Sequence, residues 1–451
     1  MRARRFAFVA AVVTSVGAGP ARAQEAGAED AGAFVPDEWE LGPTTLAAAR
    51  PRLPLRACAP GPGGPLCVHG PAGSEGDVLD VLSIATRVER TATGALRLPS
   101  PDRDVSTGAL DFYLVARDDD DATVRLAGRD PLASFDRAAG FVELPRSLAG
   151  CARSGAVTRA VLRAITLRVA PAASEAVSIA TAQHLAELIE PCLAGRLDDV
   201  AAFQREPARA IFDVGERRGD RRYVRGAATF FDWADIRFGA APGGLVRASL
   251  ALMPTRTPQG AERFTPRPDL LDVFRTSFKE ILSVGATGDD LFHRFAGVRA
   301  TFGPAADPVA LPSARAFGEA GRIAVDFTID WPTAPRRFAS LKPIAPTGVA
   351  VMAVRRAGAA PGARLRIEAD WEEHARLRWM AIKLGPDGTP RGTVLVPSTP
   401  KATSAQATIT ELDGVSTILV VVENAGDFAR PFDPDEGPWE PHAFLVTLAS
   451  E

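Results

Sequence analysis

The 451-residue sequence lacks the short motifs that announce most enzyme chemistries. It contains no G-x-S-x-G nucleophile elbow, no phosphate-binding loop, no dinucleotide fingerprint and no H-E-x-x-H zinc motif. Its five histidines are scattered along the chain: His69, His184, His293, His374 and His442. We therefore expect neither a cofactor nor a catalytic metal, and the sequence leans towards a protein that is not an enzyme.

Lysine is nearly absent, although arginine is abundant, and the formal net charge is only −3. A mildly acidic chain is not suited to binding nucleic acid or anionic lipid through its charge, because both carry dense negative charge. We therefore predict no nucleic-acid partner, and the charge identifies no other partner.

Long apolar runs are also missing. The run Phe6–Val16 is much shorter than the ~20 residues that a bilayer span needs. It follows basic residues and precedes Ala21-Arg22-Ala23, which is the order of a secretory signal peptide and its cleavage site. We predict that residues 1–23 are a signal peptide, that the chain has no transmembrane segment, and that the protein is exported, either periplasmic or secreted. The alternative is an uncleaved N-terminal anchor.

The chain has only four cysteines, which is an even number. An even count in an exported chain indicates disulfide bonds. Neighbour pairing, Cys58 with Cys67 and Cys151 with Cys192, is the favoured one of three connectivities. The second bond would join the open ends of two predicted helices. A zinc site is the alternative, but no C-x-x-C spacing supports it.

Composition and periodicity divide the mature chain into three stretches. Residues 24–75, rich in Pro, Gly and Ala, predict an extended arm, and residues 76–320 predict a mainly helical domain. Residues 321–451 predict a β-sandwich, because short alternating segments recur between Pro and Gly residues. The expected fold class is therefore α+β.

The individual elements follow from the same patterns. We predict helices over 77–91, 156–169, 174–190, 223–238, 243–252, 269–284 and 289–302. The helical domain should also hold strands over 110–115, its hairpin partner 122–126, and 140–144. The sandwich strands should lie at 323–329, 348–355, 364–370, 377–384, 392–396, 405–410, 417–423 and 442–448.

Three groups of polar residues are weak candidates for metal sites. His184 and Glu187 share one helix face, but a pair at this spacing is more often a hydrogen bond than a ligand pair. Asp118–Asp121 and Asp433–Glu436 could bind calcium, although the EF-hand spacing is absent. Aromatic residues on the predicted helix 223–238 and the tryptophans of the sandwich are expected to pack in the cores.

The order of elements carries a resemblance. A leading helix at 78–90 is followed by Leu98-Pro99-Ser100-Pro101, the strand Asp111–Val115, and a strand that ends in Pro145. The segments 159–164 and 225–230 follow, and then a strand of the Pro-Thr-Gly-Val-Ala type. In the order of these elements and in their local sequence patterns, residues 76–240 resemble the zincin-type, gluzincin-like metallopeptidase domains of exported bacterial proteins.

The resemblance implies a vestigial pocket. Arg159 and Arg163 stand where such domains carry the two metal-binding histidines, Ala160 replaces the general base, and Arg225 replaces the third ligand. A guanidinium group stays protonated and has no lone pair for a metal. The resemblance therefore implies a non-catalytic relative, whose arginines pair with internal carboxylates such as Glu187, Glu175 or Asp232.

Three readings of function remain open. The first is an exported, non-catalytic relative of a zinc metallopeptidase with a binding or structural role in the cell envelope or medium. Its partner would bind through the β-sandwich. The second is an active hydrolase that uses His184, His293, Glu187 and Asp232. The third is a β-sandwich adhesion module with a helical spacer.

Overall fold

The computed structural model describes most of the chain after residue 48. The described residues are 49–129, 136–193, 196–213, 220–254, 264, 268, 270–274, 288–398, 402–427 and 439–451. The predicted signal peptide, residues 24–48 of the predicted arm, and the candidate calcium segment Asp433–Glu436 lie outside these residues. No helix among the described residues is both long and apolar enough to cross a membrane.

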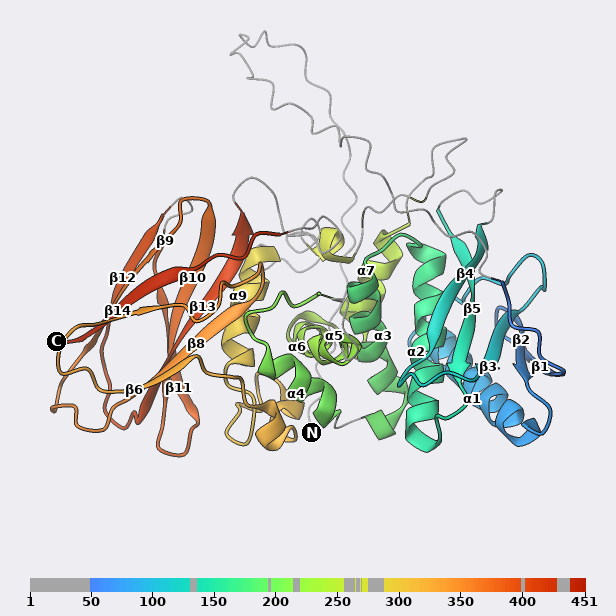
Figure 1. Cartoon of the computed structure of the whole chain (residues 1–451), viewed down its shortest axis with the longest axis horizontal. Coiled ribbons are helices and arrows are strands. Elements are labelled where there is room, and N and C mark those ends of the chain that lie inside the picture. The colour runs from blue at the N-terminus through green and yellow to red at the C-terminus, as the bar shows by residue number, and fades with distance from the viewer. Residues whose placement is uncertain are drawn as a thin grey trace, which may run out of the picture. The chain divides into compact units, whose positions relative to one another are not determined.

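The first folded layer is a five-stranded mixed sheet (Figure 1). Its strands are β1 (Leu55–Gly61), β2 (Gly64–Gly70), β3 (Leu110–Val115), β4 (Thr123–Arg129) and β5 (Ala138–Pro145). Their order is β1-β2-β3-β5-β4. Strand β3 runs parallel to β2 and β5, whereas β1 and β4 run antiparallel to their neighbours and form the two edges.

This sheet corrects two predictions. Residues 55–70, expected in an extended arm, form the antiparallel hairpin β1–β2 instead. The segment expected to pair with 110–115 as a hairpin pairs with β5 instead. The physical reason is that β3 is buried on both faces, so it takes the centre of the sheet and both its neighbours run parallel to it.

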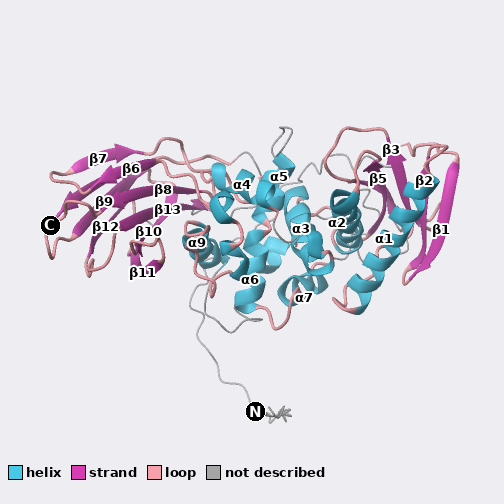
Figure 2. Cartoon of the chain, turned by 90° about the horizontal axis from the view of Figure 1, so that it is seen from below, coloured by secondary structure: helices cyan, strands magenta, loops and turns pink. Residues whose placement is uncertain are grey.

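Helices pack against this sheet and against one another. They are α1 (Glu75–Gly94), α2 (Gly150–Val169), α3 (Glu175–Ile189), α4 (Leu197–Arg205), α5 (Asp220–Ala227), α6 (Thr229–Phe238), α7 (Gly244–Leu252) and α9 (Gly288–Arg299). Short 3-10 turns lie at Pro191–Leu193, Pro312–Arg315 and Gly318–Gly321. Figure 2 shows α1 and α2 beside this sheet, although α1 lies between β2 and β3 in the sequence. Of the predicted helix 269–284, only residues 270–274 are described, and they are helical.

The predicted helix 223–238 is broken in two. The backbone amide of Ala228 donates to Arg225 at 3.1 Å, and the Thr229 hydroxyl donates to the Gly226 carbonyl at 2.8 Å. Gly226, near the end of α5, lets α4 approach closely, because a Cβ there would lie 2.3 Å from the Asp199 carbonyl oxygen. The helix that the apolar periodicity predicted as continuous is therefore two helices, α5 and α6.

Both predicted disulfide bonds are present. Cys58 and Cys67 face each other across the β1–β2 hairpin, and Cys151 and Cys192 join the open end of the α2–α3 pair. The side chain of Ser174 caps α3 as expected, accepting from the Val177 amide. Two disulfides and no free cysteine among the described residues fit an oxidising compartment.

The C-terminal part is a β-sandwich, as predicted. One sheet has the order β11-β10-β13-β8-β6, and the other β12-β9-β14-β7. The strands are β6 (Phe327–Asp330), β7 (Arg336–Ala339), β8 (Val349–Arg355), β9 (Leu365–Trp371), β10 (Ala375–Leu384), β11 (Pro390–Val396), β12 (Ser404–Ile409), β13 (Thr417–Asp427) and β14 (Phe444–Ser450). The sequence missed β7, because it is short and its side chains are largely exposed. Trp371, Trp379 and Phe444 stack in the core between the sheets.

The sandwich is not a separate module on a linker. Helix α9 covers the outer face of the β8–β10–β13 sheet. There Met380, Val351 and Val421 form a second buried cluster with Ala296 of α9 and with Ala300, which follows the helix. A Cβ at Gly297 would lie 2.8 Å from the sulfur of Met380, so the helix sits directly on the sheet. The predicted boundary at residue 320 therefore cuts through a packed interface.

A buried arginine strengthens the same junction. Arg299 at the end of α9 is fully buried, donates to Gln204 and to the Phe203 carbonyl, and lies 3.5 Å above the Phe203 ring. Burial lowers the pKa of Arg299 to about 10. Gln204 in turn donates to the carbonyls of Arg299 and Gly321, so α4, α9 and the start of the sandwich are tied together.

Candidate functional site

Two of the three arginines of the expected vestigial pocket, Arg159 and Arg225, meet in the interior, and Arg163 lies partly exposed near Asp121. Arg159 and Arg163 extend from α2 and Arg225 from α5, and Arg159 and Arg225 are 7% and 5% exposed. The loop between β3 and β4 brings Asp121 to the same place. Residues that lie far apart in the sequence thus meet at one buried point.

Asp121 is the shared partner of two arginines. Arg159 binds it through two nitrogens, with Nη2–Oδ1 at 2.9 Å and Nε–Oδ2 at 3.1 Å. Arg225 approaches the other side, with Nη1–Oδ2 at 3.4 Å. Burial alone would raise the pKa of Asp121, but the charges of Arg159 and Arg225 hold that pKa below its ordinary value. The carboxylate therefore stays ionised between the two guanidinium groups.

Of the three arginines, Arg225 has the most carboxylate partners. Its Nε and Nη2 both lie 3.0 Å from the carboxylate of Asp199, in the first turn of α4, and Nη2 lies 3.1 Å from Asp120. Burial would lower the pKa of Arg225, but Asp199 and Asp121 raise it above its ordinary value. A permanently protonated group thus fills the position that the resemblance gives to a metal ligand.

Arg163 lies at the edge of this arrangement. It contacts Glu175 at 3.4 Å, and burial lowers its pKa even though Glu175 opposes the change. Its Nε atom has no hydrogen-bond partner among the described residues. Glu175 is thus the one expected carboxylate that does partner an arginine of the pocket. Ala160, the position expected to replace the general base, is buried.

We call the group formed by Arg159, Arg163, Arg225, Asp121 and Asp199 the arginine–aspartate network. The sequence indicated Asp121 only as part of a candidate calcium segment, so it did not predict this residue as the central anion. Asp119 pairs with Arg117, and Asp120 with Arg222 and Arg225. Carboxylates that already bind guanidinium groups do not offer calcium the six to eight free oxygens that it needs.

A second buried network adjoins the first. His184 Nδ1 lies 2.6 Å from Asp232, and Arg196 binds both Asp232 and Glu187. Burial would raise the pKa of Asp232, but Arg196 and His184 hold it below its ordinary value. Gln183 connects the networks, because its amide donates to Glu187 at 2.8 Å and accepts from Arg159 at 3.1 Å.

The residues of the hydrolase reading do not all converge. His184, Glu187 and Asp232 belong to this second network, whereas His293 lies on α9 and contacts Glu423 of β13 at 3.3 Å. His184 and Glu187 have separate partners, so they do not form the metal pair that their spacing suggested. Among the described residues, no three His, Cys, Asp or Glu side chains are arranged to hold a metal ion.

Two surface hollows are lined by other residues. One, of about 390 Å³, lies between β1 and α1. The other, of about 360 Å³, lies beside α9 and the outer face of β10 and β11, and His293, Met380 and Leu395 contribute to its wall. Neither is lined by the arginines of the network.

Comparison with known proteins establishes no family. No protein-family model matches the chain. No curated protein matches it either. Among solved structures, one similarity is to the pre-peptidase C-terminal domain of a collagenase from Bacillus anthracis, with 8% identity and a TM-score of 0.19 over 28% of this chain and 97% of that one. Another is to chitosan-binding module 1 of a chitosanase/glucanase from Paenibacillus sp. IK-5, with 14% identity and a TM-score of 0.16 over 25% of this chain and 75% of that one. Scores this low establish no functional relationship.

Proposed function

We propose that this chain is an exported, non-catalytic relative of zinc metallopeptidases, with a binding or structural role in the cell envelope or medium. The observation that carries the proposal is the convergence of Arg159 and Arg225 on one buried carboxylate. The two arginines lie on different helices, α2 and α5, and at positions that the resemblance gives to metal ligands.

The network also supports the non-catalytic part of the proposal. A zinc hydrolase needs three ligands with free lone pairs and an open position for water. The corresponding positions here carry guanidinium groups, whose hydrogen bonds are directed at Asp121, Asp199 and Gln183. A cation placed there would meet fixed positive charge from two sides. The residues present therefore do not fit a zinc ion.

The other two readings have weaker support. The hydrolase reading needs His293 beside His184, but each has its own carboxylate partner. The spacer reading needs a sandwich that is independent of the helices, but α9 is packed on its outer face. The export part of the proposal rests on the sequence of residues 1–23 and on the two disulfide bonds.

Metal analysis and a peptidase assay test the proposal together. The mature protein, purified from zinc-supplemented medium and dialysed, should contain far less than one equivalent of zinc by mass spectrometry. It should cleave neither casein nor a library of quenched peptides. Near-stoichiometric zinc, or cleavage that a chelator abolishes, would contradict the proposal.

A further inference from the structure

The edge strand β1 has backbone amide and carbonyl groups that are not hydrogen-bonded to β2. The Cα atoms of Cys58 and Cys67 lie only 4.1 Å apart, which is the spacing of a non-hydrogen-bonded antiparallel pair. The amide and carbonyl of Cys58 therefore point away from β2, and so, by alternation, do those of Arg56. Strand β1 ends the sheet, and no other described strand pairs with it.

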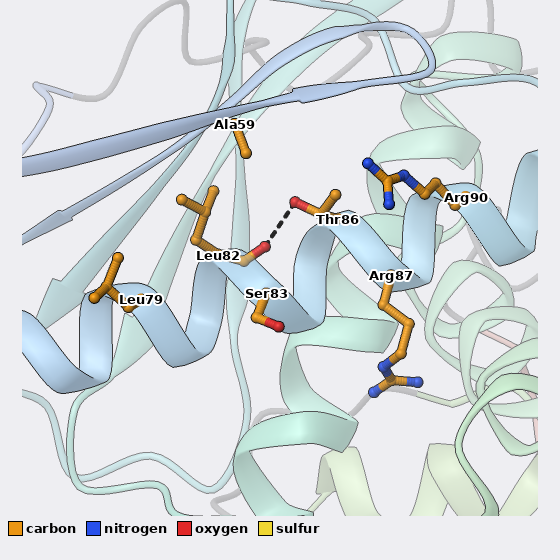
Figure 3. A pocket seen from close by; sticks show the side chains of 7 residues that line it. All are labelled: Ala59, Leu79, Leu82, Ser83, Thr86, Arg87 and Arg90. Atoms are coloured by element: carbon orange, nitrogen blue, oxygen red, sulfur yellow. Dashed lines mark hydrogen bonds between the residues drawn. The ribbon is translucent and has the colours of Figure 1, made fainter.

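A groove runs along this edge. One wall of the groove is the surface of α1 (Figure 3), and Ala59 of β1 lies on the opposite side. The lining residues of α1 form a stripe along the helix: Leu79, Leu82, Ser83, Thr86, Arg87 and Arg90. The stripe is about 16 Å long at 1.5 Å per helical residue. An extended peptide of about five residues has the same length.

The two ends of the groove differ in chemistry. Leu79 at one end is 60% exposed, an unusual position for a leucine on a helix that packs against a sheet. At the other end Arg90 is exposed and has no ion-pair partner among the described residues. Arg87 pairs with Glu190, and no acidic residue lines the groove.

We propose that β1 and this groove form a docking site for an extended, acidic peptide segment of a partner protein. The peptide would pair with the open backbone groups of Arg56 and Cys58 as an additional strand. One of its side chains would be apolar and contact Leu79, and an acidic side chain further along would meet Arg90. This inference rests on the binding role proposed above and names its partner by chemistry.

A second copy of this chain is a poorer occupant. If β1 paired with β1 of a second copy, the two exposed Arg56 side chains and the two sets of groove arginines would lie close to each other. Like charges on paired strands destabilise the pairing. The prolines Pro54 and Pro60 also restrict the open edge to a short stretch. A short peptide fits that stretch better than a long strand does.

Peptide selection tests the site. A phage-displayed library of random nine-residue peptides is selected on the mature wild-type protein, and the enriched peptides are measured by fluorescence anisotropy. We expect alternating sequences that combine an apolar residue with Asp or Glu. Leu79→Glu and Arg90→Glu should each weaken binding about tenfold, because both place negative charge in the groove. Arg336→Glu, an exposed site on the sandwich, is the matched control and should change nothing.

Backbone methylation separates strand pairing from simple charge attraction. The best peptide is made in two forms, with N-methyl groups at odd or at even positions. Only one form should lose binding, because only alternate amides face β1. Equal loss in both forms, enrichment of no peptide, or binding unaffected by both groove variants would overturn the docking site. A concentration-dependent dimer that Leu79→Glu abolishes would overturn it in favour of a second copy. None of these outcomes bears on zinc content, so the two proposals fail separately.

Discussion

Arginine occurs throughout the chain, but among the described residues only the helical region buries some of its arginines. Arg159, Arg225 and Arg299 are almost inaccessible to solvent, whereas Arg336 and Arg355 lie on the surface of the sandwich. The helical region brings carboxylates from distant loops to its guanidinium groups. The sandwich instead buries Trp379 and Phe444 between its sheets. Both regions have apolar cores, but the helical region adds buried charge pairs between residues far apart in the sequence.

This difference has an energetic meaning. Apolar side chains contribute to stability wherever they are buried, so a sandwich core tolerates many rearrangements. A buried ion pair contributes little net stability, but removal of one partner leaves an uncompensated charge and costs several kcal/mol. The helical region should therefore be far more sensitive to the loss of a single charged residue.

The largest effect should follow from Asp121→Ala. Two buried guanidinium groups would lose their shared anion, and we expect a loss of about 5 kcal/mol in the free energy of unfolding. Chemical denaturation measures the change. Asp119→Ala on the same loop removes only an exposed pair and should cost below about 1 kcal/mol. Equal effects of the two variants would break the comparison between the regions.

The disulfide that joins α2 and α3 should come next. Replacing Cys151 and Cys192 by serine opens a loop with a sequence separation of 41, and the chain-entropy relation predicts a loss of about 4 kcal/mol. The Cys58–Cys67 loop is shorter, with a separation of 9, and its removal should cost about 3 kcal/mol. Thermal and chemical unfolding of the two double variants give the order, and a reversed order would argue against the entropic account.

Met380→Ala tests the junction between the regions. Met380 is buried beneath α9, so truncation should cost about 3 kcal/mol. Leu395→Ala is the control, because Leu395 is 63% exposed on the neighbouring strand and should change stability by about 0.5 kcal/mol or less. If Met380→Ala were as mild as its control, the sandwich would behave as an independent module.

The smallest expected effect is a change in acid sensitivity. The pKa of Asp121 is lower in the folded state than in the unfolded chain, so its contribution to stability is complete above the unfolded value of about 4. That contribution is lost as the pH falls through the lower, folded value. Asp121→Asn should therefore flatten the loss of stability in acid, measured as unfolding free energy against pH. A parallel pH profile for wild type and variant would show that the carboxylate does not titrate in this way.

The two regions also differ in how far the sequence predicted them. Strand β3 was predicted at its exact bounds, and the sandwich strands within a few residues, because alternation is a local signal. The hairpin 55–70 was missed because Pro and Gly dominate its composition. The break at Ala228 was missed because the apolar periodicity runs through it without interruption.

The candidate site shows the same limit. The sequence singled out Arg159, Arg163 and Arg225 and predicted carboxylate partners for them. It identified Glu175 as a partner, but it considered Asp121 only as part of a candidate calcium segment. Only the three-dimensional position of the β3–β4 loop shows which aspartate is buried.

Arg159 and Arg225 share one carboxylate, Asp121, and this has a consequence for the evolution of the chain. Because one carboxylate serves two guanidinium groups, exchange of any single member leaves the others with unbalanced charge in the interior. A lineage that alters one of these positions therefore passes through a poorly folded ancestor unless the others change with it. Positions 121, 159 and 225 should be inherited as a block, and they should covary more strongly than their distances along the sequence suggest.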